Sequence, residues 1–430
     1  MAINRGLRIV ARPGHPDFLD LPWDQSLDAW HDARIVDVPH GIHRHVVQFI
    51  DYDGVLYALK ELQPRVAQRE YAMLRKMAEE EIPVVEVVGV VERSGLPADL
   101  RALDDVLITR YLDYSLPYRA LFINRRSTTD VRGLHDRLID SLAMLLVRLH
   151  LSGFFWGDCS LSNTLFRRDA GALAAYLVDA ETGEWHPTLS RGQREEDLDI
   201  AELNVIGGLL DLQAQLDLPP DPDPEEMALL LRRSYTGLWE ELTTEVVIGR
   251  DERYKIEARL RRLNELGFDV DEMELVSTDE GDRLVLKTSV SEKGHHRRRL
   301  LSLTGLEAQE NQARVLLNDL ANFRLVLERN SGRPVSESIA AHRWMNEVFE
   351  PSIRAIPDEL RGKLEPVEIF HEIIEHKWFA SEAAGRDIGI DEAVASYIDK
   401  VLPAVPDERT LLDPGLLGAE DSTGGWMSYG

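Results

Sequence analysis

Three polar residues in the middle of the chain have the types and the order that phosphate transfer requires. Asp158 lies in the segment WGDCSLSN, Asn163 follows five residues later, and Asp179 ends an apolar strand at 174–178. One carboxylate can orient or deprotonate an acceptor hydroxyl, while an amide oxygen and a second carboxylate can hold Mg²⁺ on the phosphates of ATP. This pattern predicts an ATP- and Mg²⁺-dependent phosphotransfer site, with Asp158 as the catalytic residue and Asn163 and Asp179 as metal ligands.

Lys60 and Glu70 form a second candidate pair nearer the start of the chain. Lys60 ends the apolar strand VLYALK, and Glu70 lies on the apolar face of the helix that follows. Because an unpaired buried charge is costly, we expect Glu70 to have Lys60 as its partner. The pattern alone leaves a second interpretation open, in which the two are a surface lysine and a helix-edge glutamate.

The elements that must position these residues change from short strands to helices along the first half of the chain. Apolar runs flank the turn DYDG and predict a hairpin of 46–50 with 55–60. Helical spacing predicts helices at 66–79 and 136–150, and further apolar runs predict strands at 84–91 and 106–110. The segment DLPPDPDPE holds four prolines and predicts a linker at 217–224.

Beyond this linker the pattern predicts a mainly helical C-terminal domain at 225–419 with one β-hairpin, so the fold class is α+β. The predicted helices are 225–247, 250–266, 306–329, 335–349, 367–379 and 390–401, and the hairpin pairs 274–277 with 283–289. The Gly/Ser-rich segment 420–430 is expected to be a flexible tail.

Taken together in chain order, the five polar residues resemble the protein-kinase-like superfamily. Asp158 and Asn163 match its catalytic-loop D-x-x-x-x-N, Asp179 its metal-binding aspartate, and Lys60 and Glu70 its strand-lysine and helix-glutamate pair. The short gap between Lys60 and Glu70 and the Gly-Asp before the cysteine look more like the bacterial lipopolysaccharide (Kdo) kinase-like and aminoglycoside-kinase-like branches than classical protein kinases. The arrangement is similar to a bacterial family that joins this half to an uncharacterised C-terminal half.

The resemblance implies a bilobal kinase-like domain at 1–216 with ATP between its lobes, and the helices up to about 266 are candidates to complete the second lobe. It implies that the turn VPHGIHRH covers the phosphates, where Gly41 is one glycine in place of three and Arg44 is a candidate side-chain donor. Backbone groups near Arg110, Tyr111 and Leu112 would contact adenine. Glu181, two residues after the metal-binding aspartate, is a further candidate metal ligand.

The expected reaction is transfer of the γ-phosphoryl group of ATP to a hydroxyl of a sugar-like or other small-molecule acceptor. The alternative is a pseudokinase scaffold or nucleotide sensor whose C-terminal half binds a protein partner. The single-glycine turn favours this alternative, as does Ala-Glu in place of Phe-Gly after Asp179. Retention of the three polar residues of the catalytic and metal positions favours the enzyme.

The composition of the chain excludes some kinds of binding partner and indicates the cell compartment in which the protein is expected. With 49 Lys and Arg against 76 Asp and Glu, the net charge is −27, which makes a nucleic-acid-coating role unlikely. One cysteine, Cys159, excludes an intrachain disulfide and a Cys-based zinc site, and we expect it to be a packing residue. No export signal or run of about 18 apolar residues is visible. We therefore expect a soluble, cytoplasmic protein without a membrane span.

For three further features the sequence allows both a functional and a purely structural interpretation. Near the start of the apolar helix 200–212, the resemblance implies that Asp197 or Asp199 braces the catalytic loop, whereas either could simply favour a helix N-terminus. The basic run KGHHRRR at 293–299 is a solvated loop before a helix, or a site for a phosphate or acidic group. The polar stripe Asn311, Arg314, Asn318 and Asn322 lines a cleft or forms an exposed helix face.

Two histidine-rich segments resemble metal sites, but their details favour structural roles. The histidines at 40, 43 and 45 have no carboxylate in their cluster, so we interpret them as turn residues. The segment HEIIEH at 371–376 spaces its histidines five apart, and a regular helix cannot turn both toward one metal. Within it, Glu372 and His376 are predicted to form an i,i+4 ion pair.

Overall fold

The computed structural model describes residues 7–36, 45–93, 103–123, 131–216, 222–244, 246–249, 268–277 and 283–405, with residues 258, 261 and 408. Most of the predicted linker, most of the predicted helix 250–266 and the tail lie outside these described residues. The first part of the chain forms β1 Arg8–Ala11, β2 Ile35–Val36, β3 Val47–Tyr52, β4 Val55–Leu62, α1 Pro64–Glu79, β5 Val87–Glu92, β6 Asp105–Arg110, β7 Leu116–Pro117, α2 Tyr118–Ile123, α3 Val131–Leu151, β8 Phe154–Phe155, β9 Thr164–Asp169, β10 Ala172–Leu177, β11 Glu184–Trp185, α4 Arg191–Leu216 and α5 Pro224–Thr243.

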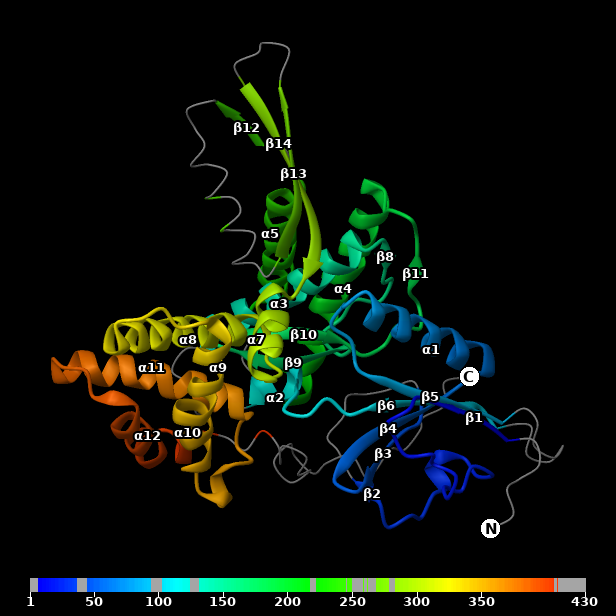
Figure 1. Ribbon diagram of the computed structural model, residues 1–430. Helices are drawn as coiled ribbons and strands as arrows, with labels where there is room; N and C mark the ends of the chain where they lie inside the picture. The colour runs from blue at the N-terminus through cyan, green and yellow to red at the C-terminus, as the bar shows by residue number, and fades with distance from the viewer. Residues whose placement is uncertain are drawn as a thin grey trace.

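The remainder is mainly helical. It forms β12 Val246–Gly249, β13 Phe268–Ser277, β14 Arg283–Lys293, α7 His295–Thr304, α8 Glu310–Ser331, α9 Glu337–Trp344, a π-helical turn Met345–Phe349, α10 Glu350–Arg354, α11 Pro366–Ala384 and α12 Gly389–Lys400. Figure 1 shows α8 to α12 gathered on one side of the molecule, α1 with the first sheet on the other, and the strands β12, β13 and β14 projecting at the top. The α+β class, with a kinase-like first half and a helical C-terminal part, agrees with the prediction.

The first lobe is a six-stranded antiparallel sheet in the order β1-β5-β6-β4-β3-β2, with α1 packed against β4, β5 and β6. The predicted hairpin is present as β3 and β4, joined by Asp53 and Gly54. Both turn residues have positive φ, 53° and 82°, and glycine reaches this region without steric cost. This tight turn sets the register that pairs Lys60 with Val47 on β3.

Strand β4 presents its two faces to two different cores. Leu62 packs with α1 and the second lobe, while Tyr57 and Leu59 pack under the N-terminal segment 18–30, which contributes Trp23 and Trp30. Because side chains alternate along a strand, Lys60 shares the face of Leu62 and points toward α1. The sequence patterns did not predict that the N-terminal segment covers the outer face of the sheet.

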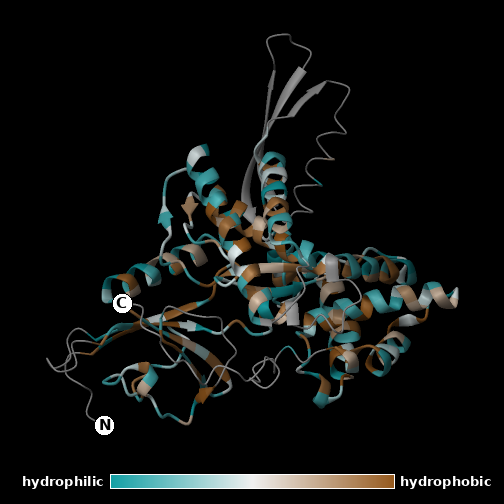
Figure 2. Cartoon of the chain, turned by 180° about the vertical axis from the view of Figure 1, so that it is seen from behind, coloured by the Kyte–Doolittle hydropathy of each residue, from teal (hydrophilic) through white to brown (hydrophobic). Residues whose placement is uncertain are grey.

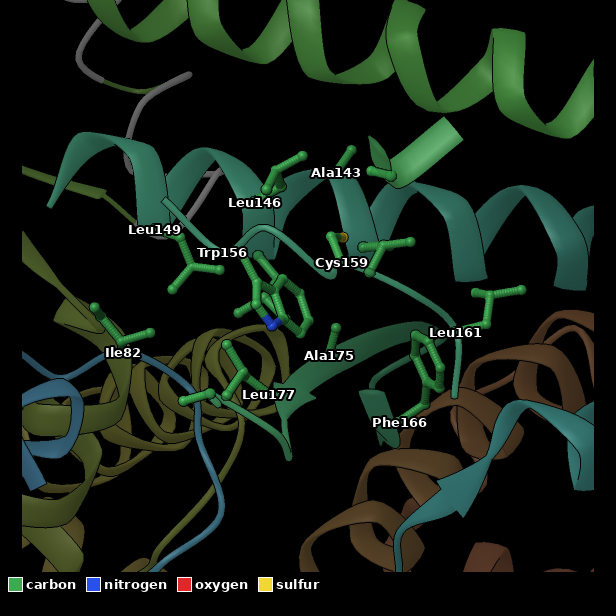
Figure 3. Packing of buried hydrophobic residues seen from close by; sticks show 14 of the residues in the cluster. Ile82, Ala143, Leu146, Leu149, Trp156, Cys159, Leu161, Phe166, Ala175 and Leu177 are labelled. Atoms are coloured by element: carbon green, nitrogen blue, oxygen red, sulfur yellow. The ribbon is translucent and has the colours of Figure 1, made fainter. Parts of the chain in front are cut away.

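The second lobe is built around α3, which packs against β10 and α5. In Figure 3 the side chain of Trp156 lies between α3 and β10, close to Leu146, Leu149 and Leu177. Its Nε1–H donates to the carbonyl of Asp179 at 2.9 Å, which ties the loop after β8 to the end of β10. This buried indole therefore anchors the segment that carries two of the predicted site residues.

Beyond the linker the predicted hairpin of 274–277 with 283–289 is present, whereas the end of one predicted helix and the predicted loop at 293–299 are wrong. The helix predicted at 225–247 ends at Thr243, and 246–249 form strand β12 because Val246, Val247 and Ile248 are β-branched residues that favour extended backbone. β12 pairs with β14, so the predicted hairpin is part of a three-stranded sheet in the order β12-β14-β13. The basic run is not a loop, since α7 begins at His295 and carries its three arginines.

The C-terminal helices enclose two adjoining apolar clusters. One centres on Trp344, Phe349 and Phe370, and the other on Ile373 and Tyr397. Figure 2 shows apolar and polar residues alternating along these helices, as expected for helices with one buried face. Within the described ranges, no helix is long and apolar enough to cross a membrane.

The hairpin β9–β10 is the main contact between the first half and the C-terminal helices. Buried Asp169 accepts hydrogen bonds from the N–H of Gln312 at 2.8 Å and from Asn311 Nδ2 at 3.0 Å, and Tyr176 donates to Gln309 at 2.7 Å. Asn311 thus lies at the contact between the two halves and lines a cavity there, as the cleft interpretation of its polar stripe expects. Asn318 and Asn322, farther along α8, are exposed.

Two arginines of β9 add ion pairs to this interface. Arg167 lies 2.7 Å from Glu365, and Arg168 lies 2.6 Å from Glu408. The carboxylates of both pairs are largely buried, so removing one partner would leave the other charge without compensation. The C-terminal helices therefore hold the strands that lead from Asn163 and into Asp179.

The carboxyl of Asp169 should make the stability of the chain depend on pH. Burial raises its pKa to about 6, although bonds from Gln312 and Asn311 oppose the shift, whereas an unfolded aspartate titrates near ~4. The folded state therefore holds this proton more tightly. The stability that Asp169 contributes is complete below ~pH 4 and is lost as the pH rises through ~6, by up to roughly 3 kcal/mol.

Denaturant unfolding at several pH values between ~4 and ~6 measures how the unfolding free energy depends on Asp169. Asp169→Asn should flatten the decline in unfolding free energy, because the amide does not titrate in this range. Asp199→Asn, at an exposed residue of α4, corrects for the loss of one carboxylate. An Asp169→Asn profile that runs parallel to the wild-type profile would contradict the assignment.

Candidate active site

Lys60 connects three elements of the two lobes. Its Nζ lies 2.7 Å from Asp179 Oδ2, which follows β10, and 3.3 Å from Glu70 Oε2 on α1. Glu70 is fully buried, and the lysine side chain is only 17% exposed, so the pair is not a surface contact. The ion pair predicted between Lys60 and Glu70 is present, and the structure adds Asp179 as a third member.

The electrostatics of this cluster follow from its burial. Burial opposes the charge of Lys60, but the carboxylates of Glu70 and Asp179 outweigh it and raise the pKa of the ammonium group. Burial raises the pKa of Glu70 to about 7, and the charge of Asp179 adds to this, while Lys60 acts in the opposite direction. Lys60 is therefore held in its charged form, at a position where it can act on a second negative group.

Asp158 is fixed by two amide side chains. Its Oδ2 accepts a hydrogen bond from Asn163 Nδ2 at 3.0 Å, and its Oδ1 accepts one from Asn204 Nδ2 at 3.1 Å. Asn204 also donates to the carbonyl of Cys159 at 3.1 Å. The sequence patterns missed Asn204, because it lies 46 residues farther along the chain on α4 and belongs to no motif.

The strand pair β9–β10 brings the two predicted metal ligands to neighbouring positions. Thr164 pairs with Leu177, and the N–H of Val178 donates to the carbonyl of Asn163 at 3.0 Å. Asn163 thus directly precedes β9, beside the end of β10, and Asp179 lies two residues after that end. Since the amide nitrogen of Asn163 bonds to Asp158, its amide oxygen is the atom that can bind a cation.

Asp197, and not Asp199, braces the loop that carries Asp158. The fully buried carboxylate of Asp197 accepts hydrogen bonds from the N–H groups of Trp156 at 2.7 Å and Gly157 at 2.8 Å. Gly157 has a φ of 74°, a left-handed conformation that favours glycine. The exposed Asp199 pairs instead with Arg232 at 2.5 Å.

A buried histidine extends this bracing into α5. His150 contacts Asp197 through Nε2 at 3.0 Å and the hydroxyl of Tyr235 through Nδ1 at 2.6 Å. Burial lowers the pKa of His150, although Asp197 acts against the shift. Tyr235 lies beyond the Pro-rich segment, so α5 contributes directly to the support of the Asp158 loop.

The segment predicted to receive adenine follows β6. The N–H of Arg110 donates to the carbonyl of Glu86 at 2.8 Å, and the N–H of Tyr111 donates to the carbonyl of Leu56 at 2.9 Å. These two N–H groups are used within the protein and are not free for a ligand. Of the three predicted residues, Leu112 therefore remains the candidate for an N–H contact.

The predicted phosphate-covering residues Gly41 and Arg44 lie outside the described residues, as do His40 and His43. His45 is described, and its Nε2 lies 2.9 Å from Glu181 Oε2. Glu181 was a candidate metal ligand, but its carboxylate here contacts His45, two residues before β3, and so joins the two lobes. The N–H of Glu181 also donates to Asp179 Oδ1 at 2.9 Å, which orients that carboxylate.

Two further predictions concern Cys159 and the pair Glu372 and His376. Cys159 is fully buried in the core, and burial raises the pKa of its thiol, as expected for a packing residue. The predicted ion pair of Glu372 with His376 is wrong, because both side chains bond to α12 instead. Glu372 accepts from the hydroxyl of Tyr397 at 2.5 Å, and His376 lies 3.0 Å from Ser396 Oγ.

Comparison with known families agrees with this geometry. Residues 54–205 match the model of the lipopolysaccharide kinase (Kdo/WaaP) family. The first half of this chain resembles that kinase family. The match supports a phosphotransferase of the sugar-kinase kind. Residues 237–402 match a different model, DUF4032, a domain of unknown function.

A solved structure described as WaaP in complex with acyl carrier protein shares 18% identity with the chain. The similarity covers 54% of this chain and 88% of that one, with a TM-score of 0.34. A comparison with curated protein sequences gives no significant match.

The donor set suits a magnesium–nucleotide complex. Mg²⁺ prefers oxygen ligands, and the amide oxygen of Asn163 and the carboxylate of Asp179 are of this kind. The charged amine of Lys60, held by Glu70, lies beside the same carboxylate and suits the phosphates. The residues present therefore fit both groups.

Proposed function

We propose that the chain is an ATP- and Mg²⁺-dependent phosphotransferase that acts on a hydroxyl of a sugar-like or other small-molecule acceptor. The observation that carries the proposal is the contact of Lys60 with both Glu70 and Asp179, which links the sheet, α1 and the end of β10 at one point. The similarity of residues 54–205 to a lipopolysaccharide kinase family supports the class of reaction.

Each polar residue then has a distinct role. Asp158, oriented by Asn163 and Asn204, would align the acceptor hydroxyl and accept its proton. Lys60 would neutralise charge on the phosphates. Asn163 and Asp179 would hold Mg²⁺, which supplies further neutralisation of phosphate charge when bound.

The nucleotide contacts are assigned by the same resemblance. The N–H of Leu112 is the proposed adenine contact, beside Arg110 and Tyr111. Gly41 and Arg44 remain the proposed phosphate contacts of the preceding turn. Together with Lys60, these residues would place the γ-phosphoryl group toward Asp158.

We also propose that the kinase-like unit continues through α5, because Tyr235 and His150 join this helix to the support of the Asp158 loop. The C-terminal helices would then form a second unit, docked on β9–β10 and able to bind a protein partner with its remaining surface. The Pro-rich segment at 217–224 connects α4 to α5 inside the first unit in this scheme.

Calorimetric titration with ATP, with and without Mg²⁺, tests the nucleotide site. We expect binding that requires Mg²⁺ and that Asp179→Asn weakens about 10- to 100-fold, because the substitution removes the charge of a metal ligand. Asp199→Asn removes an exposed carboxylate of the same lobe and should bind ATP as the wild type does.

The result of this titration, together with an assay for turnover, distinguishes an active phosphotransferase from a pseudokinase scaffold. Mg²⁺-dependent binding followed by release of ADP in the presence of an acceptor supports the phosphotransferase. Binding without turnover on a broad panel of sugars would favour a nucleotide-sensing pseudokinase. No binding at millimolar ATP would contradict the proposal.

A further inference from the structure

A cavity lies between the two halves of the chain, apart from the Lys60 cluster. Its volume is about 240 Å³, and it is lined by α3, by β10 and by the start of α7 and α8. Figure 1 shows α7 and the start of α8 beside β9, β10 and α3. At about 30 Å³ for each water molecule, the space holds roughly eight waters, which suits a small metabolite better than a nucleotide.

Two guanidinium groups from opposite sides of the interface line this cavity. Arg148 belongs to α3 and is partly buried, while Arg297 belongs to α7 and is exposed. Burial lowers the pKa of Arg148, Glu310 acts against this shift, and the positive charge of Arg297 adds to it. Docking the two halves thus brings two guanidinium groups to one cavity, beside the carboxylates of Asp140, Asp169 and Glu310, and an anionic ligand between the two arginines would reduce their mutual repulsion.

The three acidic residues of the lining contact neighbours of their own, and Asp140 accepts a hydrogen bond from Ser234 Oγ at 2.6 Å. Glu310 accepts hydrogen bonds from the N–H groups of His296 and Arg297 and lies 2.6 Å from His296 Nδ1. Both oxygens of Asp169 accept from Asn311 and Gln312. Within the described ranges, the guanidinium of Arg297 has no ion-pair partner.

The remaining wall is partly apolar. Met144 and Leu145 of α3 face the cavity together with Leu173 of β10. Arg137 is a third guanidinium on the same face of α3, eleven residues before Arg148. The cavity therefore combines several cationic donors with an apolar surface that can contact a short carbon chain.

We propose that this interface cavity is a second ligand site, which binds a small metabolite carrying a phosphate or carboxylate group through Arg148 and Arg297. The planar guanidinium matches both kinds of anion with paired hydrogen bonds. One wall is β10, the strand that leads to Asp179. The site is separate from the proposed nucleotide site and does not depend on phosphotransfer.

Calorimetry on the full chain with glycerol 3-phosphate, citrate and uncharged glycerol tests the site. We expect at least one of the two anions to bind and glycerol not to bind. Arg297→Gln and Arg148→Met should each weaken that binding about 10- to 100-fold, since each removes a charge-assisted contact. Binding of glycerol 3-phosphate alone would identify a phosphate site, and binding of citrate alone would identify a carboxylate site.

Two controls keep the result specific. Arg299→Gln lies two residues along α7, where Arg299 pairs with Glu337 at 2.7 Å, and should bind the anion like the wild type. Lys60→Met should also keep this binding even if it loses ATP. Circular dichroism checks that Arg148→Met is folded. If it is not folded, the test of anion binding rests on Arg297→Gln, which changes an exposed residue.

The proposal is overturned if neither anion binds at about 10 mM, a range in which weak metabolite sites are still detected. It is also overturned if Arg297→Gln binds at wild-type strength, or if Lys60→Met abolishes binding. In that last case the anion occupies the nucleotide site.

Discussion

Replacing Asp158 with asparagine should lower the rate of phosphotransfer about 10²- to 10⁴-fold, the usual contribution of a positioned general base. The substitution keeps the size of the side chain and one acceptor oxygen, so part of the contact with Asn163 and Asn204 can persist. We therefore expect ATP binding and the unfolding free energy to change little. A coupled assay of ADP release, with calorimetry on the same samples, separates the two effects.

Asn204→Ala provides a graded comparison for this site. It removes one of the two groups that orient Asp158 but leaves the carboxylate in place, so we expect a loss of about tenfold in rate and unchanged ATP binding. Asp199→Asn should behave as the wild type. If phosphotransfer persisted at the wild-type rate in Asp158→Asn, the catalytic assignment would be wrong.

Substitution of Asp197 with alanine should cause one of the largest losses of stability in the chain. The change leaves the N–H groups of Trp156 and Gly157 and the ring of His150 without their acceptor in a fully buried position. Each unsatisfied buried group costs about 1–3 kcal/mol, so we expect the unfolding free energy to fall by about 3–5 kcal/mol. Denaturant titration measures this directly.

Asp199→Ala, two residues farther along α4, is the matched control. Asp199 is exposed and shares Arg232 with Glu195 and Glu202, so its removal should cost less than about 1 kcal/mol. Asp197→Ala should also abolish phosphotransfer, because the loop that carries Asp158 loses its anchor. Equal destabilisation by the two substitutions would show that Asp197 does not brace the loop.

The sequence determined the elements and the pattern of the candidate site. Apolar runs on both sides of the Asp-Gly turn predicted the hairpin that carries Lys60, and helical spacing placed Glu70 on the buried face of α1. These features depend on neighbours within a few residues, so local periodicity is enough to predict them. The order of Asp158, Asn163 and Asp179 then indicated phosphate transfer.

Other features were decided only by the tertiary structure. The contact of Lys60 with Asp179 joins residues 119 positions apart, and Asn204 reaches Asp158 from a helix that carries no motif. Asp197 and Asp199 are alike in the sequence, and only the packing of α4 buries one of them under the loop that carries Asp158.

The contact between the two halves is the clearest example of a feature that local sequence patterns do not predict. Arg167, Arg168 and Asp169 look like a polar strand end, yet the C-terminal half covers them. It supplies Gln312 on α8, Glu365 just before α11 and Glu408 after the last helix as partners. A polar residue has the same local pattern whether it faces water or a distant acidic group. Its partner is fixed by long-range packing, and this is why the interface and its cavity could be found only in the structure.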